Sequence, residues 1–187
     1  MLYPKKISSK KVDIFLGILS LSMVGISVVL LVINYLTTPN IYWSHLCICG
    51  FIYTYIMVRY SATITKNISG YVAFQTILLT IVFHFIDYRI GYTGWSLNIA
   101  LPIVIIIANI SMFIITIINY EDYGKYAINQ LIIVLLSLST IYFVHRGNIN
   151  NNALIKVSII ISIFNFLVSL FLCHRDFKEQ LIRTINI

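Results

Sequence analysis

Long apolar runs separated by short polar links are the main feature of this sequence. The six runs are residues 12–36, 43–58, 71–87, 96–119, 127–144 and 153–173. A helix needs roughly 20 largely apolar residues to cross the hydrocarbon core of a bilayer, and most of the runs approach that length. The runs are continuous and do not alternate with a period of two, so they predict helices and not barrel strands. We therefore predict an all-α integral membrane protein with six transmembrane helices in one bundle.

The composition excludes the main alternatives to a membrane protein. Of the 187 residues, 59% are hydrophobic and only 10% are charged, whereas soluble domains carry about 25% charged residues. A small water-soluble fold cannot bury so much apolar surface, because a large share of its residues faces solvent. A soluble enzyme and a disordered chain are both excluded on this ground.

The charges predict the orientation of the chain. Most of the 13 Lys and Arg residues fall on the side that carries both termini. The exceptions are Arg89, Arg146 and Lys156. Because basic segments tend to stay in the cytoplasm, we predict cytoplasmic termini, N-in/C-in. Basic tails at residues 1–11 and 174–187 would then flank a membrane domain at 12–173. Frequent Ile, Asn, Tyr and Lys residues are typical of an AT-rich genome, so a multi-pass protein of a bacterial plasma membrane is expected.

The sequence also bears on partners and cofactors. No polar segment combines a basic stripe with interleaved aromatic residues, so nucleic acid is not an expected partner. His45, Cys47 and Cys49 have metal-ligating side chains, but residues two apart on a helix point about 200° apart. Only His45 and Cys49 could share a metal, and two ligands do not complete a tetrahedral site. We predict no metal and no cofactor. The bilayer is the expected partner, with a second copy of the chain or another membrane subunit left open.

Polar residues in the third and fourth runs form a candidate intramembrane cluster. Its members are Thr80, His84, Asp87, Asn98, Pro102 and Asn109. The first three stack on one helical face and the last three fall within about 40° of one another on a helical wheel. Pro102 also removes a backbone donor and predicts a kink. The cluster could line a path for a small solute, with Asp87 orienting His84.

A structural interpretation of the same cluster is preferred. Asp87 would sit at the membrane interface and reach water or Arg89, while buried amides would bond across helices. In the sixth run, a seam of small and polar residues recurs at helical spacing. The seam consists of Ser158, Ser162, Asn165 and Ser169. Small residues let helices approach closely in lipid, so we predict that this seam is a packing face.

One stretch resembles a known family. Gly91 and the segment Gly94–Trp95–Ser96 precede Asn98, Pro102 and Asn109, with Gln75 and Tyr3–Pro4 upstream. This pattern resembles a family of uncharacterised multi-spanning membrane proteins from low-GC, Gram-positive bacteria, known only as a domain of unknown function. The resemblance implies an integral membrane protein over nearly the whole chain and supplies no activity. Relatives often carry an N-terminal zinc ribbon before the Tyr-Pro pair, and this chain is expected to lack it.

The function that follows from the sequence is general. No Walker loop, dinucleotide-binding glycine motif or protease signature occurs, and no run carries a charge at its centre. We therefore predict an integral membrane protein without enzymatic activity, serving as an accessory or regulatory subunit. The alternative is a small-solute permease or channel with a polar path between the third and fourth spans. An enzyme using His84 and Asp87 is a remote third hypothesis, and it would require a third polar group beside them.

Overall fold

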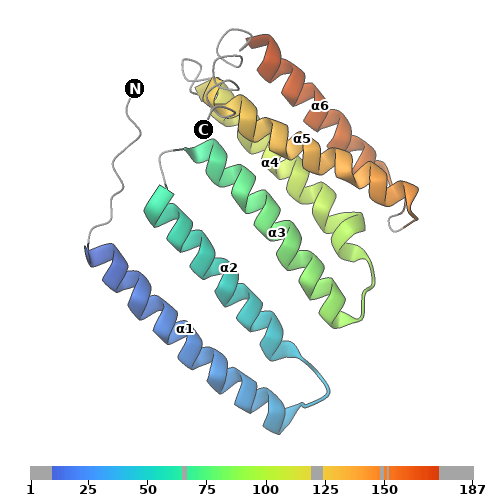
Figure 1. Cartoon of the computed structure of the whole chain (residues 1–187). Coiled ribbons are helices and arrows are strands. Elements are labelled where there is room, and N and C mark those ends of the chain that lie inside the picture. The colour runs from blue at the N-terminus through green and yellow to red at the C-terminus, as the bar shows by residue number, and fades with distance from the viewer. Residues whose placement is uncertain (1–9, 65–66, 119–123, 148–149, 151, 173–187) are drawn as a thin grey trace. The chain divides into compact units, whose positions relative to one another are not determined.

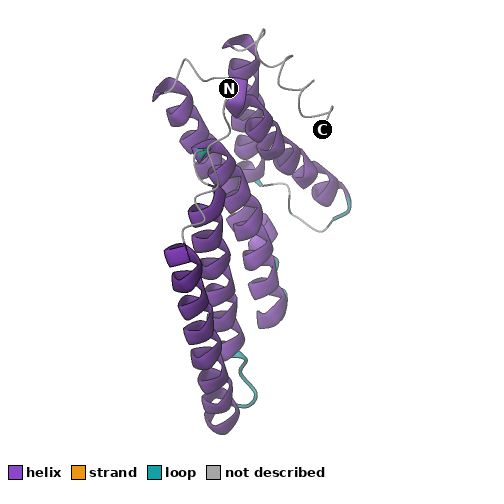
Figure 2. Ribbon diagram, turned by 60° about the vertical axis from the view of Figure 1, so that its left-hand side comes forward, coloured by secondary structure: helices purple, strands orange, loops and turns teal. Residues whose placement is uncertain are grey.

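The computed structural model describes residues 10–64, 67–118, 124–147, 150 and 152–172. Helices are the only regular elements in this part of the chain (Figure 2), which confirms the all-α prediction. Their order is α1 (Lys10–Thr37), α2 (Trp43–Ile64), α3 (Ile68–Ile90), the π-helix η1 (Ser96–Ala100), α4 (Leu101–Ile118), α5 (Gly124–His145) and α6 (Ala153–Leu172) (Figure 1). The predicted tails lie almost entirely outside the described residues.

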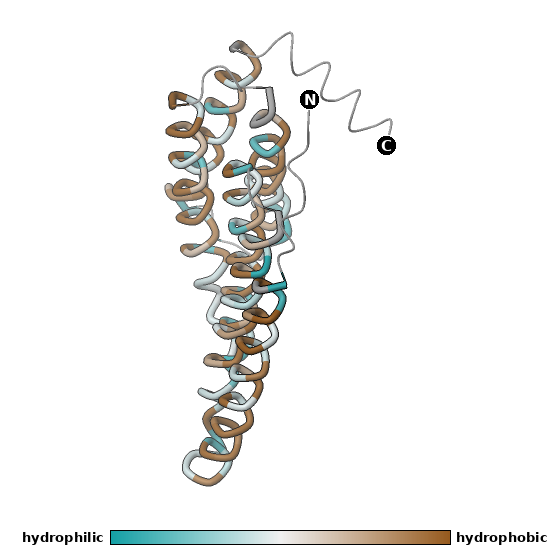
Figure 3. Tube along the Cα trace, turned by 90° about the vertical axis from the view of Figure 1, so that its left-hand side faces the viewer, coloured by the Kyte–Doolittle hydropathy of each residue, from teal (hydrophilic) through white to brown (hydrophobic). Residues whose placement is uncertain are grey.

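In the part of the chain that the structure describes, five helices are long and apolar enough to cross a membrane. They cover Val12–Thr37, Ile68–Ile90, Ser96–Ile118, Ala127–His145 and Ala153–Phe171. Hydrophobic residues, coloured brown, recur along the helices in Figure 3. Helix α2 has 22 residues, which is length enough, but its histidine, arginine and tyrosines make it less apolar than the other five. The sixth span therefore stays a prediction, as does the orientation of the termini.

The helix ends follow the apolar runs closely, with one clear exception. Helix α2 continues to Ile64, beyond the predicted end at residue 58, and α3 begins at Ile68. The added residues include Arg59, Tyr60 and Ser61, which are polar but compatible with helical backbone. Apolarity marks the part of a helix suited to hydrocarbon, whereas the helix itself can extend further.

The chain divides into two compact units, Met1–Asn67 and Ile68–Ile187. The first unit is a hairpin of α1 and α2 with little interior of its own. Leu16 and Met57 are its buried apolar side chains among the described residues. Only 6% of the apolar window of α1 is buried, and side chains such as Leu21 are 75% exposed. Such a surface is suited to lipid or protein and not to water.

The second unit contains a larger core, with α4 at its centre. Helix α4 packs against α3, α5 and α6, and half of its apolar window is buried. Ile105 of α4, Ile133 of α5 and Ile155 of α6 meet in one apolar cluster together with Leu101 and Met112. This unit also holds all six members of the candidate polar cluster and the small-residue seam.

The start of the fourth span has a local change of helical register. Leu101 donates its backbone N–H to the Ser96 carbonyl, a bond between residues five apart that defines η1. Pro102 follows and has no N–H for the Asn98 carbonyl, so the normal bond between residues four apart cannot form there. The residues just before Pro102 thus form a π-turn, a feature often found at functional sites. The predicted kink at Pro102 stays a prediction.

Candidate functional site

The carboxylate of Asp87 organises the turn between α3 and η1. Its Oδ1 accepts the Thr93 backbone N–H and hydroxyl, each at 3.0 Å, and the Gly94 N–H at 3.3 Å. Its Oδ2 accepts the Ser96 N–H at 3.2 Å and the Ser96 hydroxyl at 2.8 Å. The side chain is fully buried, so the expectation that Asp87 reaches water is wrong. A carboxylate accepts and cannot donate, which suits a turn whose donors converge on one point.

The backbone of this turn is bent through the left-handed region. Gly94 has a φ of 80°, and a Cβ added there would lie 3.2 Å from the Asn98 Nδ2. Tyr92 also has a positive φ, 52°, and its N–H donates to the Asp87 carbonyl at 2.8 Å. The turn thus depends on Asp87 through both its side chain and its backbone.

His84 lies beside this turn and contacts both Ser96 and Tyr92. Its Nδ1 lies 3.5 Å from the Ser96 Oγ, and its ring meets that of Tyr92 edge-on at 6.0 Å. Ser96 is thus a third polar group beside His84 and Asp87. Its single hydroxyl hydrogen points to the Asp87 carboxylate, so Ser96 has only lone pairs to offer the histidine. His84 is exposed, and Asp87 does not orient it directly.

The first unit contains the same turn device with an amide in place of the carboxylate. Asn34 Oδ1 accepts the Ser44 N–H at 3.1 Å and the Ser44 hydroxyl at 2.7 Å. Its Nδ2 donates to the carbonyls of Thr38 and Ile41, at 2.8 and 2.7 Å. As in the second unit, a polar side chain near the end of one helix binds a serine that follows a tryptophan in the next.

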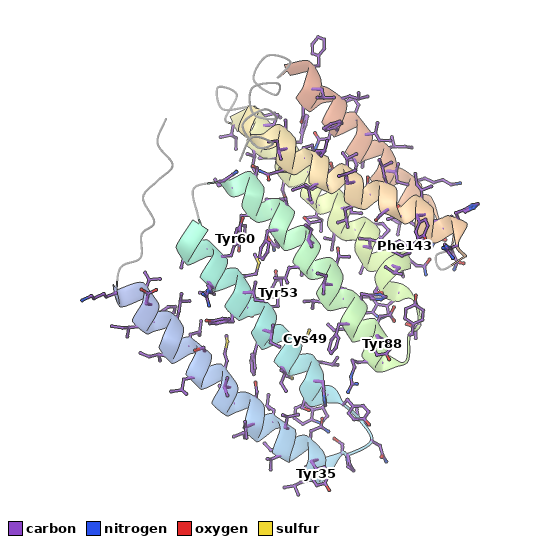
Figure 4. All side chains as sticks on the ribbon, viewed as in Figure 1. Tyr35, Cys49, Tyr53, Tyr60, Tyr88 and Phe143 are labelled. Atoms are coloured by element: carbon purple, nitrogen blue, oxygen red, sulfur yellow. The ribbon has the colours of Figure 1, made fainter. Side chains whose placement is uncertain are left out.

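A short sequence repeat underlies the two turns. Ile33–Asn34–Tyr35 precedes Trp43–Ser44, and Ile86–Asp87–Tyr88 precedes Trp95–Ser96. Tyr35 and Tyr88 lie near the ends of α1 and α3 (Figure 4) and are 77% and 68% exposed. Sequence reasoning missed this repeat because it is short and its two halves are separated by links of different length. Aligning the two Trp-Ser pairs would have revealed it.

A second polar group lies among α4, α5 and α6. Asn109 Nδ2 donates to the Ile105 carbonyl at 2.8 Å and to the Ser162 Oγ at 2.7 Å. Its Oδ1 accepts Gln130 Nε2 at 2.7 Å, and Asn165 Nδ2 donates to the Asn109 carbonyl at 2.8 Å. We call Asn109, Gln130, Ser162 and Asn165 the amide network. All four side chains are buried, and the network joins three helices.

The six members of the predicted cluster do not form one site. Asn98 donates to the Gly94 carbonyl at 2.8 Å and accepts the Asn150 N–H at 2.7 Å, so it ties two loops together. Thr80 donates its hydroxyl to the Thr76 carbonyl within α3, and Pro102 is buried in the core. Asn98 and Asn109 are separated by about 16 Å along the helix axis and belong to different hydrogen-bonded groups.

The seam residues on α6 are buried, whereas the cysteines on α2 are exposed or half-buried. Ser158, Ser162, Asn165 and Ser169 are all buried, and Asn165 and Ser162 enter the amide network. Gln130, the fourth member of that network, was not recognised in the sequence, where it is one glutamine at the start of an apolar run. On α2, Cys47 is exposed and Cys49 is half-buried; Cys49 is labelled in Figure 4. No group of three or more metal-ligating side chains occurs in the described part of the chain.

Comparison with known sequences identifies the family. The family described as "Family of unknown function (DUF6320)" matches residues 3–187, so the chain belongs to that family. No curated protein and no solved structure matches the chain.

Proposed function

We propose that this member of the DUF6320 family is a multi-pass integral membrane protein with a non-enzymatic accessory or regulatory role. Its place would be a bacterial plasma membrane, with six spans and both termini in the cytoplasm. Its partners would be the bilayer and either a second copy of the chain or another membrane subunit. The five membrane-length apolar helices support the membrane setting.

The observation that carries this proposal is the burial of Asn109 and its hydrogen bonds to neighbouring helices. Its side chain is fully buried, and both ends of its amide bind other groups of the same unit. A permease path needs polar groups that face water and exchange partners with a solute. Amides that bond across helices instead hold a bundle together.

The arrangement at Asp87 supports a structural role in the same way. A serine nucleophile needs a base that accepts its hydroxyl proton. The Ser96 hydroxyl donates to the Asp87 carboxylate, but four further hydrogen bonds hold that carboxylate in its charged form and make it a weak base. His84, Ser96 and Asp87 lie together at this turn. The Ser96 hydroxyl donates to Asp87, as in a side chain that caps a turn, whereas in a catalytic relay it would donate to His84.

Cysteine accessibility tests the choice between packing and transport. In a background whose native cysteines are replaced by serine, Ala108 or Asn109 is changed to cysteine and exposed to a membrane-impermeant maleimide. We expect no labelling at either position, because both are buried. Ala108→Cys leaves the amide network intact, so its result does not depend on the network's stability.

Asn98→Cys and the exposed control Asn40→Cys complete this experiment. Asn40 lies in the turn after α1 and should react readily, which shows that the reagent reaches the outer side. Reaction at both Asn98 and Asn109 at rates near that of Asn40 would support a water-filled path and contradict the packing role.

A reporter fusion tests the proposed topology. A periplasmic-type reporter joined after Asn151 should be active, because five of the six proposed spans precede that loop and the N-terminus is proposed to lie inside. A matched fusion after Asn67 should be inactive. Cytoplasmic signals from both fusions would contradict the six-span count.

A further inference from the structure

Gln130 presents a buried acceptor that nothing in the described structure satisfies. Its side chain is 1% exposed, and its Nε2 donates to Asn109 Oδ1 at 2.7 Å. Its Oε1 has no hydrogen-bond partner among the described residues. Buried polar atoms in proteins are almost always paired, so this oxygen needs an explanation.

Exchanging the oxygen and nitrogen of the amide does not remove the unpaired atom. The Ile105 carbonyl can only accept, so Asn109 must turn its Nδ2 toward it. Asn109 then presents Oδ1 to Gln130, which must answer with Nε2. The Ile105 carbonyl therefore fixes the orientation of the Asn109 amide, and the Asn109 amide fixes that of Gln130. The Gln130 oxygen is the atom that stays unpaired.

The hydroxyl groups of the neighbouring turns are already used. Ser137 donates to the Val134 carbonyl, Ser158 to the Ile155 carbonyl and Ser162 to the Ser158 carbonyl, each at 2.8 Å. Pairing Gln130 Oε1 with one of them would break an existing hydrogen bond for each one it made, with no gain in their number. The missing donor therefore has to come from outside the amide network.

We propose that Gln130 Oε1 is the acceptor of a binding site for one small, neutral hydrogen-bond donor. The four members of the network are uncharged, so they offer no counter-charge to a cation, and a hard cation would require several oxygens. An O–H or N–H group of a small molecule meets the single requirement of the site. A resident water and a small amide solute share this chemistry, and the experiment separates them.

This proposal is independent of the accessory role. A resident water would complete the packing of α4, α5 and α6 as a structural component, since buried waters commonly pair with such groups. An exchangeable solute would make the same atom a ligand site in a protein of either functional class.

Solid-state NMR of the full chain in lipid vesicles can test the site directly. The chain has three glutamines, Gln75, Gln130 and Gln180, so side-chain-labelled glutamine gives three signals. Gln130 is assigned by the signal lost in Gln130→Met. Should that variant not fold, Gln75→Met and Gln180→Met assign the remaining signal by elimination. Magnetisation transfer from water protons to the Gln130 carbonyl carbon is then measured. The reference is the side-chain carbonyl carbon of Asn109, labelled in the same way, which is equally buried and also carries exchangeable N–H protons.

Three outcomes are informative. Faster transfer to Gln130 than to Asn109, without added solute, establishes a resident water. Equal transfer followed by a saturable shift of the Gln130 carbonyl on addition of urea establishes a solute site. Equal transfer with no shift at any urea concentration that leaves the other glutamine signals unchanged overturns the proposal.

Discussion

The two hairpin turns of this protein share a design but have different side chains at their centres. In the turn after α1, Asn34 binds Ser44, and in the turn after α3, Asp87 binds Ser96. The surroundings explain the difference. The first turn presents two carbonyls as well as donors, so it needs an amide that both donates and accepts. The second presents five donor contacts to one side chain, so it needs a carboxylate.

The units that contain these turns also differ in their interiors. Few of the described side chains of the α1–α2 hairpin are buried, and its buried polar side chains among them, Asn34 and Ser44, lie at the turn. The second unit adds an apolar core and the amide network, which connects residues far apart in the sequence. Local hydrogen bonds are enough to shape a hairpin, whereas the arrangement of four helices requires contacts between them.

Asp87→Asn should produce the largest effect. The amide nitrogen of the variant would have to face a donor in place of an acceptor, which leaves buried donors unpaired. We expect a loss of about 3 kcal/mol in the free energy of unfolding of the second unit, measured by denaturant titration with Trp95 fluorescence. Tyr88→Phe, at an exposed side chain next to Asp87 in the same unit, is the control and should change stability by less than about 0.5 kcal/mol.

Asn109→Ala should have the second largest effect. It removes the side chain at the centre of the amide network and with it four hydrogen bonds. At about 0.6 kcal/mol each in a membrane bundle, the expected loss is about 2 kcal/mol, measured in the same titration. Ser111→Ala, which removes one exposed hydroxyl bond on the same helix, should cost almost nothing. Equal losses for the two variants would show that the network does not stabilise the unit.

Asn34→Asp should have the smallest effect and sharpens the comparison most directly. The variant keeps the acceptor for Ser44 but loses the donor to Thr38 and Ile41, whose carbonyls can in part turn to solvent at the exposed turn. We expect a loss of about 1 kcal/mol in the free energy of unfolding of the first unit, measured by denaturant titration with Trp43 fluorescence. A gain in stability would mean that the first turn, like the second, prefers a carboxylate, and that its two carbonyls do not require an amide donor.

Much of the fold could be predicted from the sequence, but the site could not. The apolar runs predicted the positions of the helices for two reasons. Helical hydrogen bonds join residues close in sequence, and apolar side chains mark the surface that avoids water. The polar cluster was assembled from helical spacing alone, which relates residues on one helix and carries no information about its neighbours. Asn98 and Asn109 share a face of the fourth span, yet one binds a loop and the other binds α5 and α6.

The sequence by itself determined the all-α fold class, the approximate positions of the helices and the family, because each of these depends on composition and on patterns along the chain. The tertiary structure decided which polar groups meet. It took Ser162 and Asn165 from the seam, Asn109 from the cluster and Gln130 from the start of the fifth run and joined them in one network. The reason is physical: hydrogen bonds extend about 3 Å, so their partners depend on how helices pack and not on distance along the sequence.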